Sequence, residues 1–139
     1  MSELSGLELR KAACEALGFH FEELKDDSGP VPSRLYVVRP DGSRYGSYNA
    51  DFYRDRFNRI QFYPAIESDP AVSEPMFLAW LCEFNKKHPR TYICIELYAD
   101  ESCGLQLLEQ DTGDDLINAD GHTLSEARAR AIVAAMEKR

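Results

Sequence analysis

Apolar residues recur at helical spacing in three stretches of the chain. The first covers residues 6–17, where Ser5 opens a capping-box pattern and Gly18 supplies a left-handed stop. The second begins near Ser73, with a proline in its first turn, and the third starts at Thr123. The apolar stripes are Leu9, Ala12, Ala13, Ala16 and Leu17, then Phe77, Trp80, Leu81 and Phe84, then Ala127, Ala131, Ile132, Ala135 and Met136. We therefore expect three amphipathic helices.

Strand patterns fill the stretches between these helices. Residues 34–39 are β-branched and aromatic, and the turn ending in Gly42 connects them to residues 43–48 as a hairpin. Residues 92–99 and 104–110 form a second candidate pair, which a short turn joins. Both pairs should be antiparallel.

The order of helix, strands, helix, strands, helix predicts an α+β fold. We expect a single domain over residues 1–139, in which about three helices sandwich an antiparallel sheet. Residues 49–72 have no clean period, and Pro64 and Pro70 interrupt any long element. This segment is predicted to be a long ordered excursion.

Composition indicates a protein of the cytoplasm. No window has the roughly 18 apolar residues of a membrane span, and the start of the chain lacks a secretory-signal pattern. The four cysteines have no C-x-x-C spacing, so we expect free thiols, with Cys14 and Cys82 buried in helices. A disulfide between Cys94 and Cys103 is conceivable across a hairpin but is disfavoured in a reducing cytosol.

The net charge of -8 argues against duplex DNA as a partner, because DNA-binding domains rely on attraction to phosphate. The charge is unevenly distributed. Residues 44–63 contain four arginines and two aspartates, a local net charge of +2.

That same segment, RYGSYNADFYRDRFNRIQFY, holds seven of the chain's fifteen Phe, Tyr and Trp residues. Aromatic faces stack on bases and guanidinium groups bind phosphate, so a nucleotide-type ligand could bind here. The same residue types are enriched at protein interfaces. A third interpretation is that the rings fill the core while the arginines pair with acidic residues. The candidate binding residues are Tyr53, Arg54, Arg56, Phe57 and Arg59.

Motifs for catalysis, cofactors or metals do not stand out. There is no P-loop, G-x-G-x-x-G or H-E-x-x-H pattern, and the three histidines lie far apart in the sequence. The cluster Asp111, Asp114, Asp115 and Asp120 lacks EF-hand spacing and is predicted to be a solvated acidic loop. We expect no enzyme activity, no cofactor and no metal, with a metal-dependent enzyme lacking known motifs as the alternative.

Four segments together resemble the phage ABA-sandwich domain family. They are LELRKAACEALGF, VVRPDG, FYPAIESDPAVSEPMFLAW and INADGHTLSEARARAIVAAME, in that order. The resemblance implies an α-β-α sandwich and a phage or prophage origin, and it supplies no catalytic residues. The chain departs from the shorter members of that family through the aromatic insertion at residues 44–63.

These observations lead to a hypothesis of binding without catalysis. We expect a phage or prophage accessory protein in the host cell cytoplasm that counteracts a host defence factor. Its partner would be a host protein or an anionic small molecule such as a nucleotide-type signal, with no membrane partner, and it would form a homo-oligomer. One alternative is an acidic DNA mimic that inhibits a host nucleic-acid-binding enzyme. Another is a structural component of the virion.

Overall fold

The chain combines four helices with two antiparallel three-stranded sheets in the part that the computed structural model describes, residues 4–25 and 33–137. The helices are α1 (Gly6–Leu17), α2 (Arg56–Ile60), α3 (Pro70–Lys87) and α4 (Leu124–Glu137). The first sheet contains β1 (His20–Leu24), β2 (Arg34–Val38) and β3 (Arg44–Asn49); the second contains β4 (Thr91–Leu97), β5 (Cys103–Glu109) and β6 (Asp115–Gly121). The α+β class and the antiparallel pairing expected from the sequence are confirmed.

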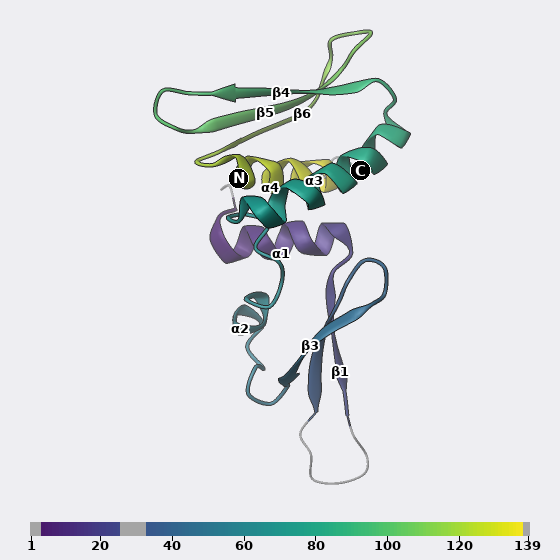
Figure 1. The fold of residues 1–139 in the computed structure, drawn as a ribbon, viewed down its shortest axis with the longest axis vertical. Coiled ribbons are helices and arrows are strands. Elements are labelled where there is room, and N and C mark those ends of the chain that lie inside the picture. Colours follow the sequence, from purple (N-terminus) through teal and green to yellow (C-terminus); the bar gives the residue numbers. More distant parts are fainter. Residues whose placement is uncertain (1–3, 26–32, 138–139) are drawn as a thin grey trace.

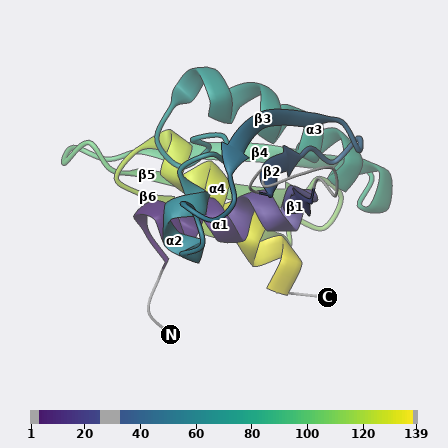
Figure 2. The same cartoon turned by 90° about the horizontal axis from the view of Figure 1, so that it is seen from below.

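The layers are arranged differently from the single helix-covered sheet that the sequence predicted. Figure 1 shows the second sheet at one end of the molecule, α3 and α4 beneath it, α1 next, and the first sheet at the far end. Helix α4 packs against β5, β6, α1 and α3, and Figure 2 shows α1 crossing it. Among the described residues, each strand pairs only with its sequence neighbours, and α2 and α3 lie between the two sets of strands in the sequence.

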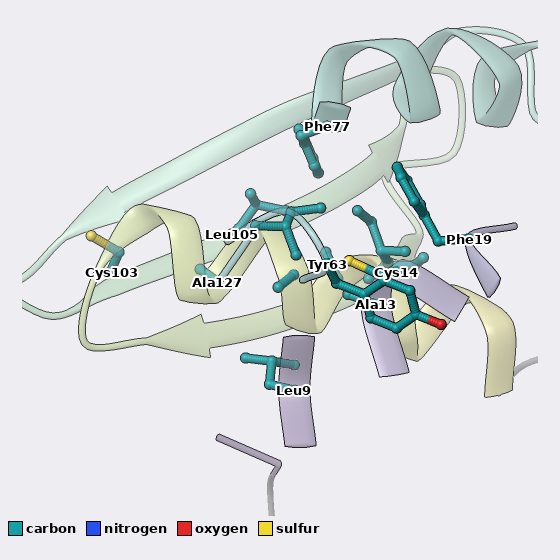
Figure 3. Close-up of a cluster of buried hydrophobic side chains, with 14 of the residues drawn as sticks. Leu9, Ala13, Cys14, Phe19, Tyr63, Phe77, Cys103, Leu105 and Ala127 are labelled. Carbon is teal, nitrogen blue, oxygen red and sulfur yellow. The ribbon is translucent and has the colours of Figure 1, made fainter. Parts of the chain in front are cut away.

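One buried cluster connects the helices to both sheets. Figure 3 shows part of it, where side chains of the helices lie beside Cys103 and Leu105 of the second sheet. Leu9 and Ala13 of α1 are fully buried, as are Ala127 and Ala131 of α4, so small side chains lie where these two helices meet. The other buried members of the cluster are Cys14, Phe19, Val37, Ile60, Tyr63, Ile66, Phe77, Cys103, Leu105, Leu107, Ile117, Ala129 and Ile132. The core therefore draws on local signals from almost every element.

Helix α1 has the predicted bounds. Gly18 adopts the left-handed conformation (φ 106°), and its N–H donates to the carbonyls of the last turn. Ser5 is the N-cap residue, but its side chain makes no capping hydrogen bond, so the predicted capping box is wrong here. The equivalent bond does form at α4, where the Glu126 N–H donates to Thr123 Oγ1 at 3.2 Å.

Helix α3 begins at Pro70, three residues before the predicted start. Asp69 caps it, since its carboxylate accepts a hydrogen bond from the Ala71 N–H at 3.0 Å, and Pro70 occupies the first turn. Pro75 lies inside the helix, not at its start. Because proline has no backbone N–H, the helix lacks one of its backbone hydrogen bonds at Pro75.

Strand β6 was missed, because residues 111–120 were predicted to be an acidic loop. Asp115 and Asp120 lie in this strand, which pairs with β5 and buries Ile117. Two of its residues on the covered face are the small Ala119 and Gly121, so the alternation of apolar and polar residues is weak in the sequence.

The described cysteines are free. Cys14 is buried as expected, whereas Cys82 is exposed on α3, contrary to the expectation. Cys103 lies opposite Leu97 and Cys94 opposite Gln106, so the conceivable hairpin disulfide has no matching register.

Gly121 marks a close approach between β6 and the start of α4. A Cβ at this position would lie 2.6 Å from the Ala127 nitrogen and 2.8 Å from the Thr123 carbonyl oxygen, both backbone atoms. We expect Gly121→Ala to lower the free energy of unfolding by about 1–3 kcal/mol, because the backbone must move to admit the methyl group. Urea unfolding followed by circular dichroism measures this.

Gly104→Ala is the matched control in the neighbouring strand. Its Cβ would first meet the Tyr98 hydroxyl at 3.1 Å, at the far end of a side chain that can move. An equal loss of stability in the two variants would contradict the steric account.

Candidate functional site

A cavity of about 1140 Å³ opens where the ends of several elements meet. The C-terminal ends of α1 and α4 and the β2–β3 turn lie at the same side of the molecule, on the right in Figure 1. The C-terminal half of α3 and the start of β6 complete the walls. The apolar lining residues are Ala16, Leu17, Phe19, Pro40, Met76, Ala79, Trp80, Phe84, Leu116, Ile117, Ile132, Ala135 and Met136.

An aromatic row on α3 forms one wall. Trp80, Phe84 and His88 follow each other at i, i+4 spacing, with ring centroids 5.2 Å and 4.5 Å apart. The row continues from Phe77, which is buried in the core, 5.5 Å from Trp80. Trp80 and Phe84 were predicted to be the buried face of the helix, but they are only half-buried. The remainder of these rings faces the cavity.

Four ionisable residues lie at the border of this apolar surface: Glu83, Lys87, His88 and Asp115. Glu83 is paired with Lys86 at 2.8 Å, which holds the pKa of Glu83 below its usual value. Asp115 accepts a hydrogen bond from the Asn118 amide at 3.4 Å. The cavity thus combines an apolar interior with a charged border, the usual composition of a small-molecule site.

The predicted binding residues lie elsewhere, around α2 and the end of β3. Arg54 is exposed and donates to Asp51 at 2.7 Å. Arg59 is largely buried, donates to Glu23 at 2.7 Å, and also donates to the Tyr53 carbonyl. The side chains of Arg56 and Phe57 lie outside the described residues. Two of the three predicted arginines are therefore engaged by carboxylates of the chain itself.

The aromatic rings of the same segment mostly pack on one another. Tyr48 stacks on Phe62 with centroids 3.6 Å apart, and Tyr53 meets the Phe62 edge at 4.8 Å. Tyr63 is buried in the core, whereas Phe52 is 73% exposed. Apart from Phe52, the described rings match the core-filling interpretation most closely.

The described residues form no metal-binding set, and the histidines lie in separate parts of the fold. Within residues 4–25 and 33–137, no three His, Cys, Asp or Glu side chains lie close enough to hold a metal ion. Over the same ranges, every helix is too short or too polar to cross a bilayer. His20, His88 and His122 lie at the start of β1, the end of α3 and the residue before the α4 cap.

Three weakly acidic side chains lie close together beside α1: Cys14 and Tyr63, which are buried, and Tyr45, which is partly buried. Burial raises the pKa of the Cys14 thiol to about 12 and that of Tyr45 to about 12, and it also raises the pKa of Tyr63. The Cys14 thiol donates to the Pro64 carbonyl, and the Tyr45 hydroxyl donates to the Phe62 carbonyl at 2.7 Å. These groups therefore remain neutral in the folded protein.

Alkaline pH should destabilise the fold through these groups. An unfolded chain releases the Cys14 proton near pH 9.0 and the tyrosine protons near 10.0, whereas the folded chain retains them to about pH 12. Because the unfolded state binds fewer protons in this interval, stability falls as pH rises, by about 1.4 kcal/mol per pH unit for each group. Urea midpoints across the interval measure this, and Cys14→Ala should delay the onset. A constant midpoint would contradict the assignment.

Comparisons with protein-family models, curated proteins and solved structures found no match to this chain. The functional argument therefore rests on the geometry of the cavity and its lining residues.

Proposed function

We propose that this protein acts by binding, without catalysis, a small amphipathic molecule in the cavity between α1, α3, α4 and β6. The supporting observation is the combination of a volume of about 1140 Å³ with an apolar, aromatic lining and a charged border. Sites for small molecules are typically a few hundred to about 1,000 Å³, with a few polar groups that orient the ligand. The cavity is large enough for such a molecule.

The lining residues suggest how the ligand would lie. Its apolar body would contact Trp80, Phe84 and Met76, where half-buried apolar surface would be removed from water. Its polar head would lie at the border, near Lys87 and His88. The proposal retains the binding role expected from the sequence but assigns the ligand to the cavity and not to residues 44–63.

Trp80 provides a direct readout because it is the only tryptophan of the chain and lines the cavity. The probes are dodecanoate, dodecylamine and dodecanol, which share an apolar body and differ in the charge of the head. We expect at least one of them to change Trp80 fluorescence saturably, below its critical micelle concentration or, for dodecanol, below its solubility limit. The head-group preference then identifies which border residues engage the ligand.

Two results would count against the proposal. The first is that none of the three probes causes a saturable change in Trp80 fluorescence. The second is a response that Arg54→Ala/Arg59→Ala abolishes, since these residues lie outside the cavity. That second result would indicate that the binding site lies in residues 44–63.

A further inference from the structure

Strand β4 has an open hydrogen-bonding edge. In the described part of the chain it pairs only with β5. The Tyr98 N–H donates to the Ser102 carbonyl and the Gln110 N–H to the Arg90 carbonyl, both at 3.0 Å. Along an antiparallel strand, the N–H and C=O groups of successive residues point alternately to one edge and the other. The even-numbered residues of β4 therefore direct these groups toward β5. The odd-numbered residues Ile93, Ile95 and Leu97 therefore direct theirs away from the sheet.

The side chains along this edge are apolar and accessible. Ile95 is 45% exposed and Leu97 is 77% exposed, although the register places Ile95 opposite the buried Leu105. The helices thus cover the face of the sheet that carries Ile95 and Leu105 at β5, but they leave it exposed at the end of β4. Edge strands of soluble proteins usually carry lysine, proline or a bulge that prevents pairing. The sequence TYICIEL has neither residue, and its pairing with β5 is regular.

We infer that a second copy of this chain occupies the edge, with the two β4 strands antiparallel across a two-fold axis at Cys94. An open row of peptide groups is complemented by another extended strand, and self-pairing would join the two sheets into one of six strands. In this register Ile93 lies opposite the partner's Ile95, and Thr91 opposite the partner's Leu97. Exposed apolar side chains of each copy would thereby be covered.

The charges favour the same register. The chain has a net charge of -8, so two copies can approach closely only through a surface of low charge. Glu96 is the single charged residue of β4. The two-fold axis at Cys94 places each Glu96 opposite the partner's Tyr92, and not opposite the other Glu96. Like charges therefore do not oppose each other across the pair.

The register makes Cys94 a specific reporter. Since residue 94 directs its peptide groups toward β5, the two Cys94 residues would form a non-hydrogen-bonded pair across the axis, with Cα atoms about 4.5 Å apart. That separation lies within the range of a disulfide. Copper-phenanthroline with dissolved oxygen can join the two thiols: each loses its proton, a sulfur–sulfur bond forms, and the two electrons pass to the oxidant.

The test combines mass in solution with this cross-link. Light scattering on the eluting peak should give a dimer at micromolar concentration, and oxidation should give a covalent dimer joined through Cys94. Cys94→Ser should abolish the cross-link, and Cys82→Ser, at the exposed cysteine of α3, should retain it. A monomer would overturn the proposal, and a dimer that cross-links only through Cys82 would overturn the register.

Two variants of Ile95 separate pairing from folding. Ile95→Lys places a charge on the edge and should give a monomer, whereas Phe52→Lys makes the same charge change at a 73% exposed residue of another surface and should remain a dimer. Ile95→Pro removes a donor directed away from β5 and leaves the donors directed toward β5 in place, so it should give a folded monomer. A dimer that persists in a folded Ile95→Lys or Ile95→Pro variant would overturn the proposal.

Discussion

Replacing Ala135 by phenylalanine is expected to weaken binding of the preferred dodecyl probe at least tenfold. Ala135 lies on α4 and lines the cavity, so the added ring would occupy space that the ligand needs. A tenfold loss corresponds to about 1.4 kcal/mol of binding free energy, less than the burial of one large apolar side chain contributes. Trp80 fluorescence titration measures the dissociation constant.

Ala71→Phe is the control for this substitution. It makes the same change at an exposed residue in the first turn of α3, outside the cavity lining. It should bind as the original chain does. If Ala135→Phe folds normally and binds with unchanged affinity, the cavity is not the binding site.

Glu67→Ala is expected to lower the free energy of unfolding by about 3–5 kcal/mol. Glu67 is 7% exposed, and its carboxylate accepts two hydrogen bonds from the Arg10 guanidinium, at 2.6 and 3.2 Å. Removing the carboxylate leaves the largely buried Arg10 charge without compensation, which is costly in a region of low dielectric. Urea unfolding followed by circular dichroism gives the value.

The paired variant Arg10→Met/Glu67→Leu tests whether the loss arises from an uncompensated charge. Replacing both partners by apolar side chains removes the buried charge together with its counterion, so most of the stability should return. A double variant as unstable as Glu67→Ala would show that packing, not charge, explains the loss.

Local signals in the sequence were sufficient for several elements. Gly18 ended α1 at the predicted residue, and Thr123, the predicted start of the last helix, accepts a capping hydrogen bond from the Glu126 N–H. Both signals act within one turn of the backbone, although the similar signal at Ser5 formed no side-chain hydrogen bond. Strand β6 was missed because Ala119 and Gly121 contribute little apolar pattern, although the close approach of α4 leaves no room for a side chain at Gly121.

The cavity could not be predicted because it depends on contacts between distant segments. The spacing of Trp80 and Phe84 is the same for a buried helix face and for the wall of a cavity. The distinction depends on how far Leu17, Pro40 and Met136 extend over that face, and these residues are far apart in the sequence. The one local indication was His88, which continues the aromatic row beyond the core.

The arginine-rich segment illustrates the same limit. Its composition allowed an anion site, a protein interface or a core-filling segment with paired arginines. In the structure Arg44 pairs with Glu22 and Arg59 with Glu23, both at 2.7 Å. These partners lie on β1, which the register of the first sheet brings beside β2. The sequence alone does not give that register, so it cannot show which arginines are paired with a carboxylate and which are free.

The most direct test of ligand binding in the cavity is an NMR titration of the ¹⁵N-labelled protein with the preferred dodecyl probe. We predict that the largest changes in amide chemical shift fall on residues of the cavity, including Trp80, Phe84, Leu116 and Ile132, and saturate together. Changes concentrated at Tyr53, Arg54 and Arg59, with the cavity residues unaffected, would contradict the account.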